Sequence, residues 1–300
     1  MTTLKHGDEH HVWFDSLDEM ERELPKSVAL GANRKRYSEI LAGRGDGWCR
    51  TQLGVPSMAV ANDAIANGSE PLLNQLQPLI ERLRQALGLG TAAALQLDVR
   101  RRKLRRGDHG DNLDMGRVWG GELDTAWSRP VRWPKVSATQ RYCTVFTDCA
   151  MPAYCDADDS LWRAAMSQCL VEILTRMGFS TEVWCGATGV RRFERGPYKH
   201  FCGVKIKDFT QPLNESRLAV MMHAMFYRSR IWAMYCDAPY QLVGSLGNPA
   251  QSGLVMPLRE RAANGERVFR VSNVTSADSA VVEIQRIVDE LKASSSAKVA

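Results

Sequence analysis

A carboxylate that follows an apolar run is the first group in this chain that could do chemistry. Residues 142–147 form a short, mostly apolar run, and Asp148 comes directly after it. Mg²⁺ prefers hard oxygen ligands, so a carboxylate at the end of a strand can bind this ion. Ala150 and Pro152 offer no side-chain oxygen beside it. Asp148 is therefore a candidate metal ligand, but we favour a loop-capping carboxylate without an ion and expect no cofactor.

The loop after Asp148 is the candidate partner-binding segment. Open α/β sheets bind ligands outside the carboxyl ends of their strands, and loops on a rigid sheet commonly carry recognition. The candidate partner-binding residues are Asp148, Cys149, Met151, Tyr154, Asp156, Asp158 and Asp159. If a metal bound at this edge, oxygen ligands could also come from Thr188, Asp208 and Asp237, which follow later strands, or from Asp156, Asp158 and Asp159 in the loop.

A dense basic run is the second group that could bind a ligand. Residues 100–106 place six positive charges in seven positions, and such a density binds phosphates by releasing counterions. Tryptophans downstream could stack on bases. The candidate nucleic-acid-binding residues are Arg100, Arg101, Arg102, Lys103, Arg105, Arg106, Trp119 and Trp127. A second basic cluster comprises Arg191, Arg192, Arg195, Lys199, Lys205 and Lys207. Pairing of the first run with Asp108, Asp111 and Asp114 is the favoured alternative.

Motifs for nucleophilic or nucleotide chemistry are missing from the sequence. It contains no Gly-x-Ser-x-Gly, no phosphate-binding Gly-x-x-x-x-Gly-Lys-Ser/Thr, and no Gly-x-Gly-x-x-Gly after a strand. Cys149 lies where a reactive thiol could be, but neither His200 nor His223 is tied to it by a motif. We expect His223, in a Met-rich helix, to be a core histidine, and we expect no enzymatic activity.

Composition indicates a globular protein of the reducing cytosol. The chain has 300 residues, of which 44% are hydrophobic and 24% charged, and its net charge of +5 is only mildly basic. No apolar run is long enough to span a bilayer, and the polar start lacks the apolar segment of a secretion signal. The eight cysteines form no Cys-x-x-Cys pair, so we expect them to be reduced and mostly buried. We expect a cytoplasmic protein without membrane contact.

Alternating patterns predict an α/β fold. The predicted strands are residues 142–147, 180–185, 200–207, 254–258 and 268–271. The predicted helices are residues 56–67, 70–87, 160–177, 215–227 and 276–291, with a kink or split at Pro78. The alternation predicts a doubly wound, mostly parallel sheet covered on both faces, preceded by a small α-rich region.

The same patterns divide the chain into four parts. Residues 1–97 are predicted to be an α-rich N-terminal region that starts with a polar lead-in. Residues 98–139 are predicted to be a basic, Trp-rich linker, because they show no sustained period. Residues 140–292 carry the α/β pattern, and residues 293–300 are predicted to be a disordered tail.

Residues 140–292, about half the chain, resemble a von Willebrand factor A-like domain. The resemblance rests on topology and spacing: the acidic residue after the first strand, a long helix, and a strand with Glu182-Val183-Trp184. Family members that bind a divalent ion carry Asp-x-Ser-x-Ser, whereas Asp148 is followed here by Cys149, Ala150, Met151 and Pro152. The resemblance therefore implies a degenerate metal site.

The whole chain is also similar to uncharacterised bacteriophage and prophage proteins. The similarity covers the helical N-terminal part, the Arg-rich run and the segment Gly107-Asp108-x-Gly110-Asp111-x-Leu113-Asp114. It implies a phage or mobile-element origin and, for a viral protein, the host cytoplasm. Our first hypothesis is a non-enzymatic protein-interaction or scaffold module that binds a partner at the top of the sheet. The alternatives are a nucleic-acid-binding protein that uses the Arg-rich linker and, least favoured, a metal-dependent enzyme.

Overall fold

The structure is a computed structural model of the 300-residue chain. It describes residues 2–6, 9–24, 41–88, 104–107, 112–113, 117–118, 121, 126–130, 141–150, 158–193, 196–236, 256–271 and 274–296.

A six-stranded sheet forms the centre of the molecule, with the strand order β1-β2-β8-β7-β6-β9. Its strands are β1 (Thr2–His6), β2 (Glu9–Phe14), β6 (Arg141–Asp148), β7 (Phe179–Phe193), β8 (Gly196–Lys207) and β9 (Arg267–Val271). β6 runs parallel to β7 and β9, β2 runs parallel to β8, and the pairs β7–β8 and β1–β2 are antiparallel. The fold is thus mixed α/β with a mostly parallel sheet, and the predicted strands 142–147, 180–185, 200–207 and 268–271 are confirmed.

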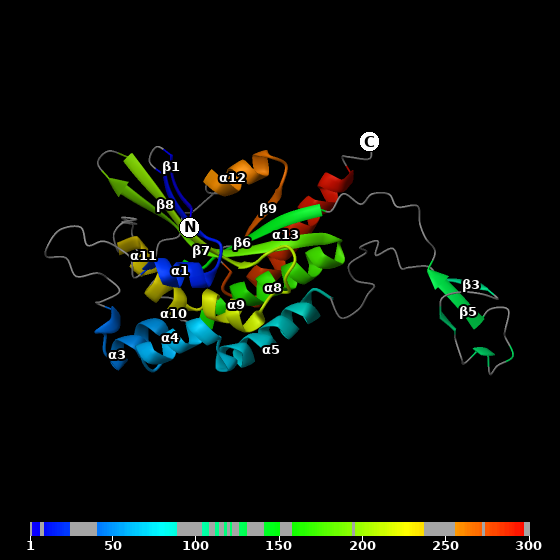
Figure 1. The fold of residues 1–300 in the computed structure, drawn as a ribbon, viewed down its shortest axis with the longest axis horizontal. Helices are drawn as coiled ribbons and strands as arrows, with labels where there is room; N and C mark the ends of the chain where they lie inside the picture. The colour runs from blue at the N-terminus through cyan, green and yellow to red at the C-terminus, as the bar shows by residue number, and fades with distance from the viewer. Residues whose placement is uncertain are drawn as a thin grey trace.

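A layer of helices covers one face of this sheet, which we call the helix face (Figure 1). The layer contains α1 (Leu17–Glu23), α4 (Met58–Asn67), α5 (Glu70–Ala86), α8 (Leu161–Arg176), α9 (Glu215–Met222) and α13 (Ala277–Ser296). On α5, the buried residues Leu72, Leu76, Ile80 and Leu83 recur at helical spacing. α8 is buried around most of its circumference. These apolar stripes and the inward residues of the strands form the main core.

Shorter helical segments complete this layer. They are α3 (Asp46–Trp48), a π-helical turn at Cys49–Leu53, a 3₁₀ turn at Asp158–Ser160, α10 (Ala224–Phe226), a second π-helical turn at Tyr227–Ile231, and α11 (Trp232–Cys236). The helix predicted at 215–227 is interrupted at His223, whose backbone is extended and whose Nδ1 accepts a hydrogen bond from the Met225 N–H. By contrast, α5 passes through Pro78 as one helix, so the predicted split is not observed.

The opposite face of the sheet, the second face, carries a smaller core. Its buried residues, the second-face cluster, are Trp13, Phe146, Trp184, Phe201 and Leu258. Leu258 comes from α12 (Met256–Ala263), which lies above this face (Figure 1). The predicted strand at 254–258 is therefore wrong where the structure describes it. Pro257 lies in the first turn of α12, where its missing N–H costs no helical hydrogen bond.

The predicted boundaries between segments of the chain do not coincide with the limits of the observed core. β1 and β2 belong to the same sheet as β6 to β9, and α4 and α5 pack into the same core as α8. The segments 1–97 and 140–292 therefore share one core. At the other end, α13 continues to Ser296, past the predicted start of the tail at 293.

Part of the predicted linker 98–139 forms a small sheet of its own. β5 (Trp127–Pro130) lies between β3 (Leu104–Gly107) and β4 (Asn112–Leu113), and both pairs are antiparallel. Across all described helices, none is long and apolar enough to cross a membrane.

Gly186 of β7 lies opposite Gly203 of β8, with the β8 backbone close beside it. A Cβ atom added at Gly186 would lie 2.2 Å from the carbonyl oxygen of Cys202, which is backbone and has little room to move. We predict that Gly186→Ala lowers the free energy of unfolding by about 1–3 kcal/mol through overpacking. Gly47→Ala is the matched control, because nothing lies within 4 Å of its added Cβ. Equal urea midpoints for the two variants would contradict this close approach.

Candidate functional site

Asp148 ends β6 and is held by three groups. The carboxylate is 1% exposed. Its Oδ2 accepts a hydrogen bond from Thr188 Oγ1 at 2.9 Å and from Arg270 Nη2 at 2.6 Å. Its Oδ1 accepts a hydrogen bond from the Ala150 N–H at 2.9 Å. Arg270 Nη2 also lies 2.9 Å from Thr188 Oγ1, so the ion pair and the hydroxyl form one closed cluster.

The backbone that leaves β6 is fixed by a second arginine. Arg163, on α8, is 4% exposed and donates from Nη1 to the carbonyl oxygens of Asp148 at 2.8 Å and Ala150 at 2.6 Å. The Cys149 N–H donates to the Gly186 carbonyl oxygen at 2.7 Å. The start of the predicted partner-binding loop is therefore anchored to β7 and to α8.

The residues at this edge do not fit the magnesium site that the family resemblance implies. The positive charge beside Asp148 Oδ2 is the guanidinium of Arg270, which takes the place a cation would need. Cys149 and Ala150 supply no hard oxygen ligand from their side chains. Asp148 Oδ1 instead accepts a hydrogen bond from the Ala150 N–H, as a loop-capping carboxylate does. In the described part of the chain, no three His, Cys, Asp or Glu side chains form a group that could hold a metal.

The structure places one of the other candidate oxygen ligands beside Asp148 and leaves some of them undescribed. Thr188 is in contact with it. Asp208 lies at the opposite edge of the sheet, because β8 runs antiparallel to β7 and its end pairs with the start of β7. Asp237 and Asp156 lie outside the described residues.

The predicted partner-binding residues separate into two groups. Asp148 and Cys149 are each 1% exposed, so they position the loop and do not contact a partner directly. This corrects their predicted role. Asp158 and Asp159 begin the turn before α8, and Asp159 is partly exposed. The other predicted residues of this loop, Met151, Tyr154 and Asp156, lie outside the described residues, as does the side chain of Asp158.

The predicted nucleic-acid-binding residues meet in the small sheet only in part. In the pairing of β3 with β5, Arg105 lies opposite Arg129, Arg106 opposite Ser128, and Gly107 opposite Trp127. The rest of that group, Arg100, Arg101, Arg102, Lys103 and Trp119, lies outside the described residues.

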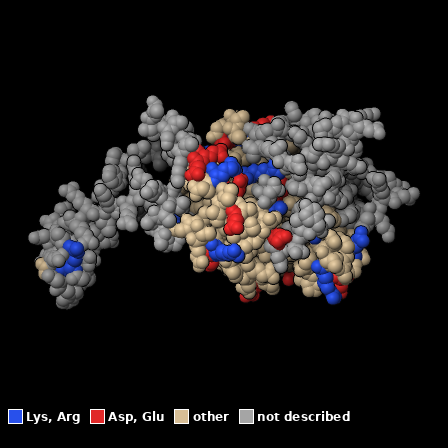
Figure 2. All heavy atoms as spheres, turned by 180° about the vertical axis from the view of Figure 1, so that it is seen from behind, with Lys and Arg blue, Asp and Glu red and all other residues tan. Residues whose placement is uncertain are grey.

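In the second basic cluster, the two lysines whose side chains are described do not share a surface. Lys205 and Lys207 belong to opposite faces of the sheet, and Lys205 is engaged by Asp15 and Glu182. On the face of the molecule shown in Figure 2, basic and acidic side chains are interspersed over the described surface. The described part of this cluster therefore gives little support to a second phosphate-binding surface.

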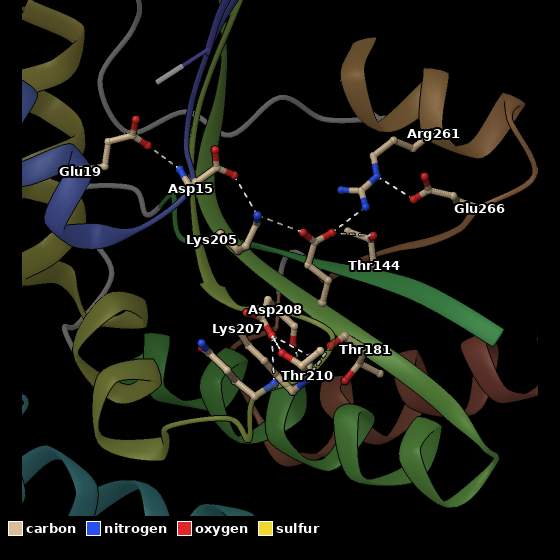
Figure 3. Close-up of polar contacts among 12 residues, drawn as sticks. Asp15, Glu19, Thr144, Thr181, Lys205, Lys207, Asp208, Thr210, Arg261 and Glu266 are labelled. Carbon is tan, nitrogen blue, oxygen red and sulfur yellow. Dashed lines mark hydrogen bonds and ion pairs between the residues drawn. The ribbon is translucent and has the colours of Figure 1, made fainter. Parts of the chain in front are cut away.

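A polar network on the second face was not predicted from the sequence. Glu182 is 5% exposed, and its Oε2 accepts hydrogen bonds from Arg261 Nη2 at 2.6 Å and from Thr144 Oγ1 at 3.3 Å. Lys205 Nζ lies 3.6 Å from Glu182 Oε1 and 2.8 Å from Asp15 Oδ1. Arg261 Nε also contacts Glu266 at 2.7 Å (Figure 3). The network joins the end of β2, the central strands and α12.

The ion pairs of this network shift the pKa values of Asp15 and Lys205. The hydrogen bond from Lys205 lowers the pKa of Asp15. Burial lowers the pKa of Lys205, but the hydrogen bond to Asp15 and the charge of Glu182 together raise it above its ordinary value. Lys205 Nζ also lies 5.1 Å from the ring centre of Trp184, which packs edge-on against Trp13. One signal for this network was present in the sequence, the glutamate Glu182 within an apolar strand, but nothing pointed to its distant partners.

The described thiols and the imidazole of His223 are poorly suited to nucleophilic or acid–base chemistry. All six cysteines whose side chains are described are buried and unpaired by disulfides, as predicted. Burial raises the pKa of Cys143 and of Cys169 to about 12 and raises the pKa of Cys185. Burial lowers the pKa of His223 to about 4, and this side chain is 1% exposed. The prediction that His223 is a core histidine is confirmed.

Comparison with known proteins adds one family. Residues 7–294 match the model of a family described as a domain of unknown function, DUF7192. The chain belongs to the DUF7192 family. No curated protein and no solved structure matches it. Of the six strands in the main sheet, the DUF7192 match leaves out only β1, and it includes Asp148, Arg163 and Arg270.

The buried ion pair of this DUF7192 protein generates a stability prediction. Arg270→Met leaves the Asp148 carboxylate buried without its cation, so we expect the free energy of unfolding to fall by about 3–5 kcal/mol. In Asp148→Asn/Arg270→Met, the loss should be smaller than the sum of the two single losses, because no unpaired charge remains. Urea denaturation measures all three variants.

The matched control is Arg286→Met on α13. Arg286 pairs with Glu283 and Glu290, but its side chain is 53% exposed. We expect this variant to lose less than about 1 kcal/mol. If the Arg270 and Arg286 variants were equally stable, Asp148 would not depend on its buried cation.

Proposed function

We propose that this DUF7192 protein is a non-enzymatic interaction or scaffold module of phage or mobile-element origin. Its partner would be a protein bound at the carboxyl-terminal edge of β6 and β7, in the cytoplasm. The strand order β8-β7-β6-β9, with α8 connecting β6 to the parallel strand β7, supports the resemblance to a von Willebrand A-like domain. The predicted helix cover on both faces is limited, among the described residues, to α12 on the second face. Fold analogy alone does not give a function, so the proposal rests on the edge itself.

The anchoring of the loop start is the observation that carries the proposal. Both carboxylate oxygens of Asp148 and the carbonyl oxygens of Asp148 and Ala150 are engaged inside the protein. The following loop therefore leaves from a backbone that is already fixed. A preorganised loop binds a partner with a smaller loss of conformational entropy than a loop that must first be ordered.

The edge of β7 offers a second element for a protein partner. β6 ends opposite Gly186, and beyond this point no described strand pairs with β7 on the β6 side. β7 itself continues to Phe193 and remains paired with β8. A strand edge of this kind can bind an extended segment of another protein through backbone hydrogen bonds. The loop and the strand edge lie at the same end of the sheet.

We predict that a loop variant, Met151→Ser/Tyr154→Ala, lowers recovery of the protein partner at least about tenfold, as expected when large interface side chains are truncated. The measurement is quantitative capture from nuclease-treated lysate of the native host, with the tagged full chain as bait. Val282→Ser is the control, because Val282 is 69% exposed and lies on α13. If the loop variant and the control captured the same partners in equal amounts, the loop would not be the contact site.

Nucleic-acid binding is a second candidate function, favoured by the register of the small sheet. Arg105 lies directly opposite Arg129, and like charges at opposite positions destabilise a strand pair. A phosphate would be attracted to both residues of such a pair, and Trp127 lies in the same strand as Arg129. For a metal-dependent enzyme, the least favoured alternative, the geometry of Asp148 offers no support, because Arg270 already occupies the carboxylate.

Salt dependence tests this second candidate. If Arg105 and Arg106 bind phosphates, log Kd for duplex DNA should rise with log salt concentration, with a slope of about 0.9 for each phosphate neutralised. Arg105→Ala/Arg106→Ala should then lower the slope by about 1 to 2. The measurement is fluorescence anisotropy at several salt concentrations, with Arg286→Ala as the control. A wild-type affinity that does not change with salt concentration would rule out this function.

A further inference from the structure

A β-bulge near the end of β8 turns one lysine away from its neighbours. Trp184 pairs with Lys205, but Val183 pairs with Lys207, so Ile206 is an extra residue in the ladder. Directly opposite residues of an antiparallel pair share a face. Lys205 therefore lies with Trp184 on the second face, and Lys207 lies with Val183 on the helix face. Figure 3 shows Lys205 on the side of Arg261 and Lys207 on the side of the helices.

The ammonium group of Lys207 is buried without a carboxylate in hydrogen-bond contact. The residue is 7% exposed, and Nζ donates to the backbone carbonyl oxygens of Thr181 and Asp208, the latter at 2.8 Å. An ammonium group carries three donors, so these two bonds leave one donor for another acceptor. Burial lowers the pKa of Lys207, and the nearby charge of Asp208 offsets this only in part. Bulges often re-aim a side chain toward a site in this way.

Lys207 lines a cavity of about 500 Å³ between α5, α8 and the ends of β7 and β8. This volume falls within the range of small-molecule sites. Two polar atoms of lining residues are buried and have no hydrogen-bond partner among the described residues, namely Thr181 Oγ1 and Gln168 Oε1. Thr181 is 2% exposed, so its hydroxyl does not reach bulk water, and a ligand in the cavity would reach it after a rotation of the lining side chains. Buried polar groups in this state usually have a ligand or water as partner.

The charges around the cavity favour an anion. Three lining side chains are positive, Arg84, Arg176 and Lys207, and one is negative, Glu172. Glu172 accepts hydrogen bonds from both arginines, so Lys207 is the cation without a carboxylate in contact. The apolar part of the lining includes Phe179, Phe209 and Leu213.

We propose that this cavity binds a small organic acid with an apolar body and one hydrogen-bond donor. The carboxylate would accept hydrogen bonds from Lys207 Nζ and Thr181 Oγ1, the donor would bind Gln168 Oε1, and the apolar body would pack on the phenylalanines. The cavity lies at the start of β7, whereas Asp148 lies at the opposite end of the sheet. The site is therefore separate from the proposed partner-binding edge, and either proposal can fail without the other.

The test uses the full chain and three probes: 4-hydroxyphenylacetate, phenylacetate and the uncharged 4-hydroxyphenylacetamide. Isothermal titration calorimetry should show saturable binding of 4-hydroxyphenylacetate. Affinity should fall about tenfold or more for the amide, because a hydrogen bond to a charged group is lost. Phenylacetate should bind more weakly than its hydroxylated form, because Gln168 Oε1 then gains no donor.

Variants then assign the binding to Lys207. Lys207→Met should lower the affinity for 4-hydroxyphenylacetate about tenfold or more, and Thr181→Val, which removes only the hydroxyl, should lower it severalfold. Lys205→Met is the matched control, because this lysine is two residues away on the other face, and its affinity should equal that of the wild type. If Lys207→Met does not fold, Thr181→Val decides the same question.

Three results would overturn the proposal. The first is no saturable binding of either acid up to about 10 mM, since a ligand of this size in a matched site reaches millimolar affinity. The second is equal affinity for the acid and the amide. The third is an effect of Lys205→Met as large as that of Lys207→Met or Thr181→Val.

Discussion

The reversal of β8 against β7 is the constraint on which most of the molecule depends. β8 runs back along β7, and the N-terminal strand β2 pairs parallel with its other edge, which brings residues 9–14 into the sheet with the direction opposite to that of β7. The same reversal carries Asp208 to the edge opposite Asp148. The bulge at Ile206 then sends two nearby lysines to different faces, one into an ion-pair network and one into a cavity. A single change of strand direction thus separates three polar sites.

At the carboxyl edge of β6, an arginine provides the positive charge beside the buried carboxylate of Asp148. A guanidinium is always protonated and donates several directed hydrogen bonds, so it can hold a carboxylate permanently. Arg270 engages Asp148 and Thr188 together, and Arg163 binds the adjacent backbone. Such an edge cannot gain or lose its cation with the ionic conditions. It suits a fixed recognition surface better than a switch that depends on a metal.

Sequence patterns predicted the elements with sustained periodicity and missed those that depend on distant partners. Residues 142–147 and 160–177 were predictable because buried strands and helices carry strong apolar patterns. The end of β2 was predictable, because Trp13 and Phe14 precede a helix that is capped at Ser16. β1 and the start of β2 were missed, because backbone pairing leaves little trace in side-chain type. A run of five residues, 254–258, could not distinguish strand from helix. Asp148 was predictable from its place after a strand, but its partner Arg270 lies 122 residues away in the sequence. The face on which Lys207 lies depends on a bulge that the sequence pattern does not reveal.

The docking of β2 onto β8 also sets an order of assembly. Asp15 and Lys205, which meet across this pair, are 190 residues apart in the chain. During synthesis, the N-terminal strand exists long before its partner and must wait until β8 has been made. Closing such a long loop costs entropy before any contact is gained, and pairing at this range is slow. The unit from β6 to β8 is local by comparison and can form first. The first residues of the protein are therefore among the last to reach their final place.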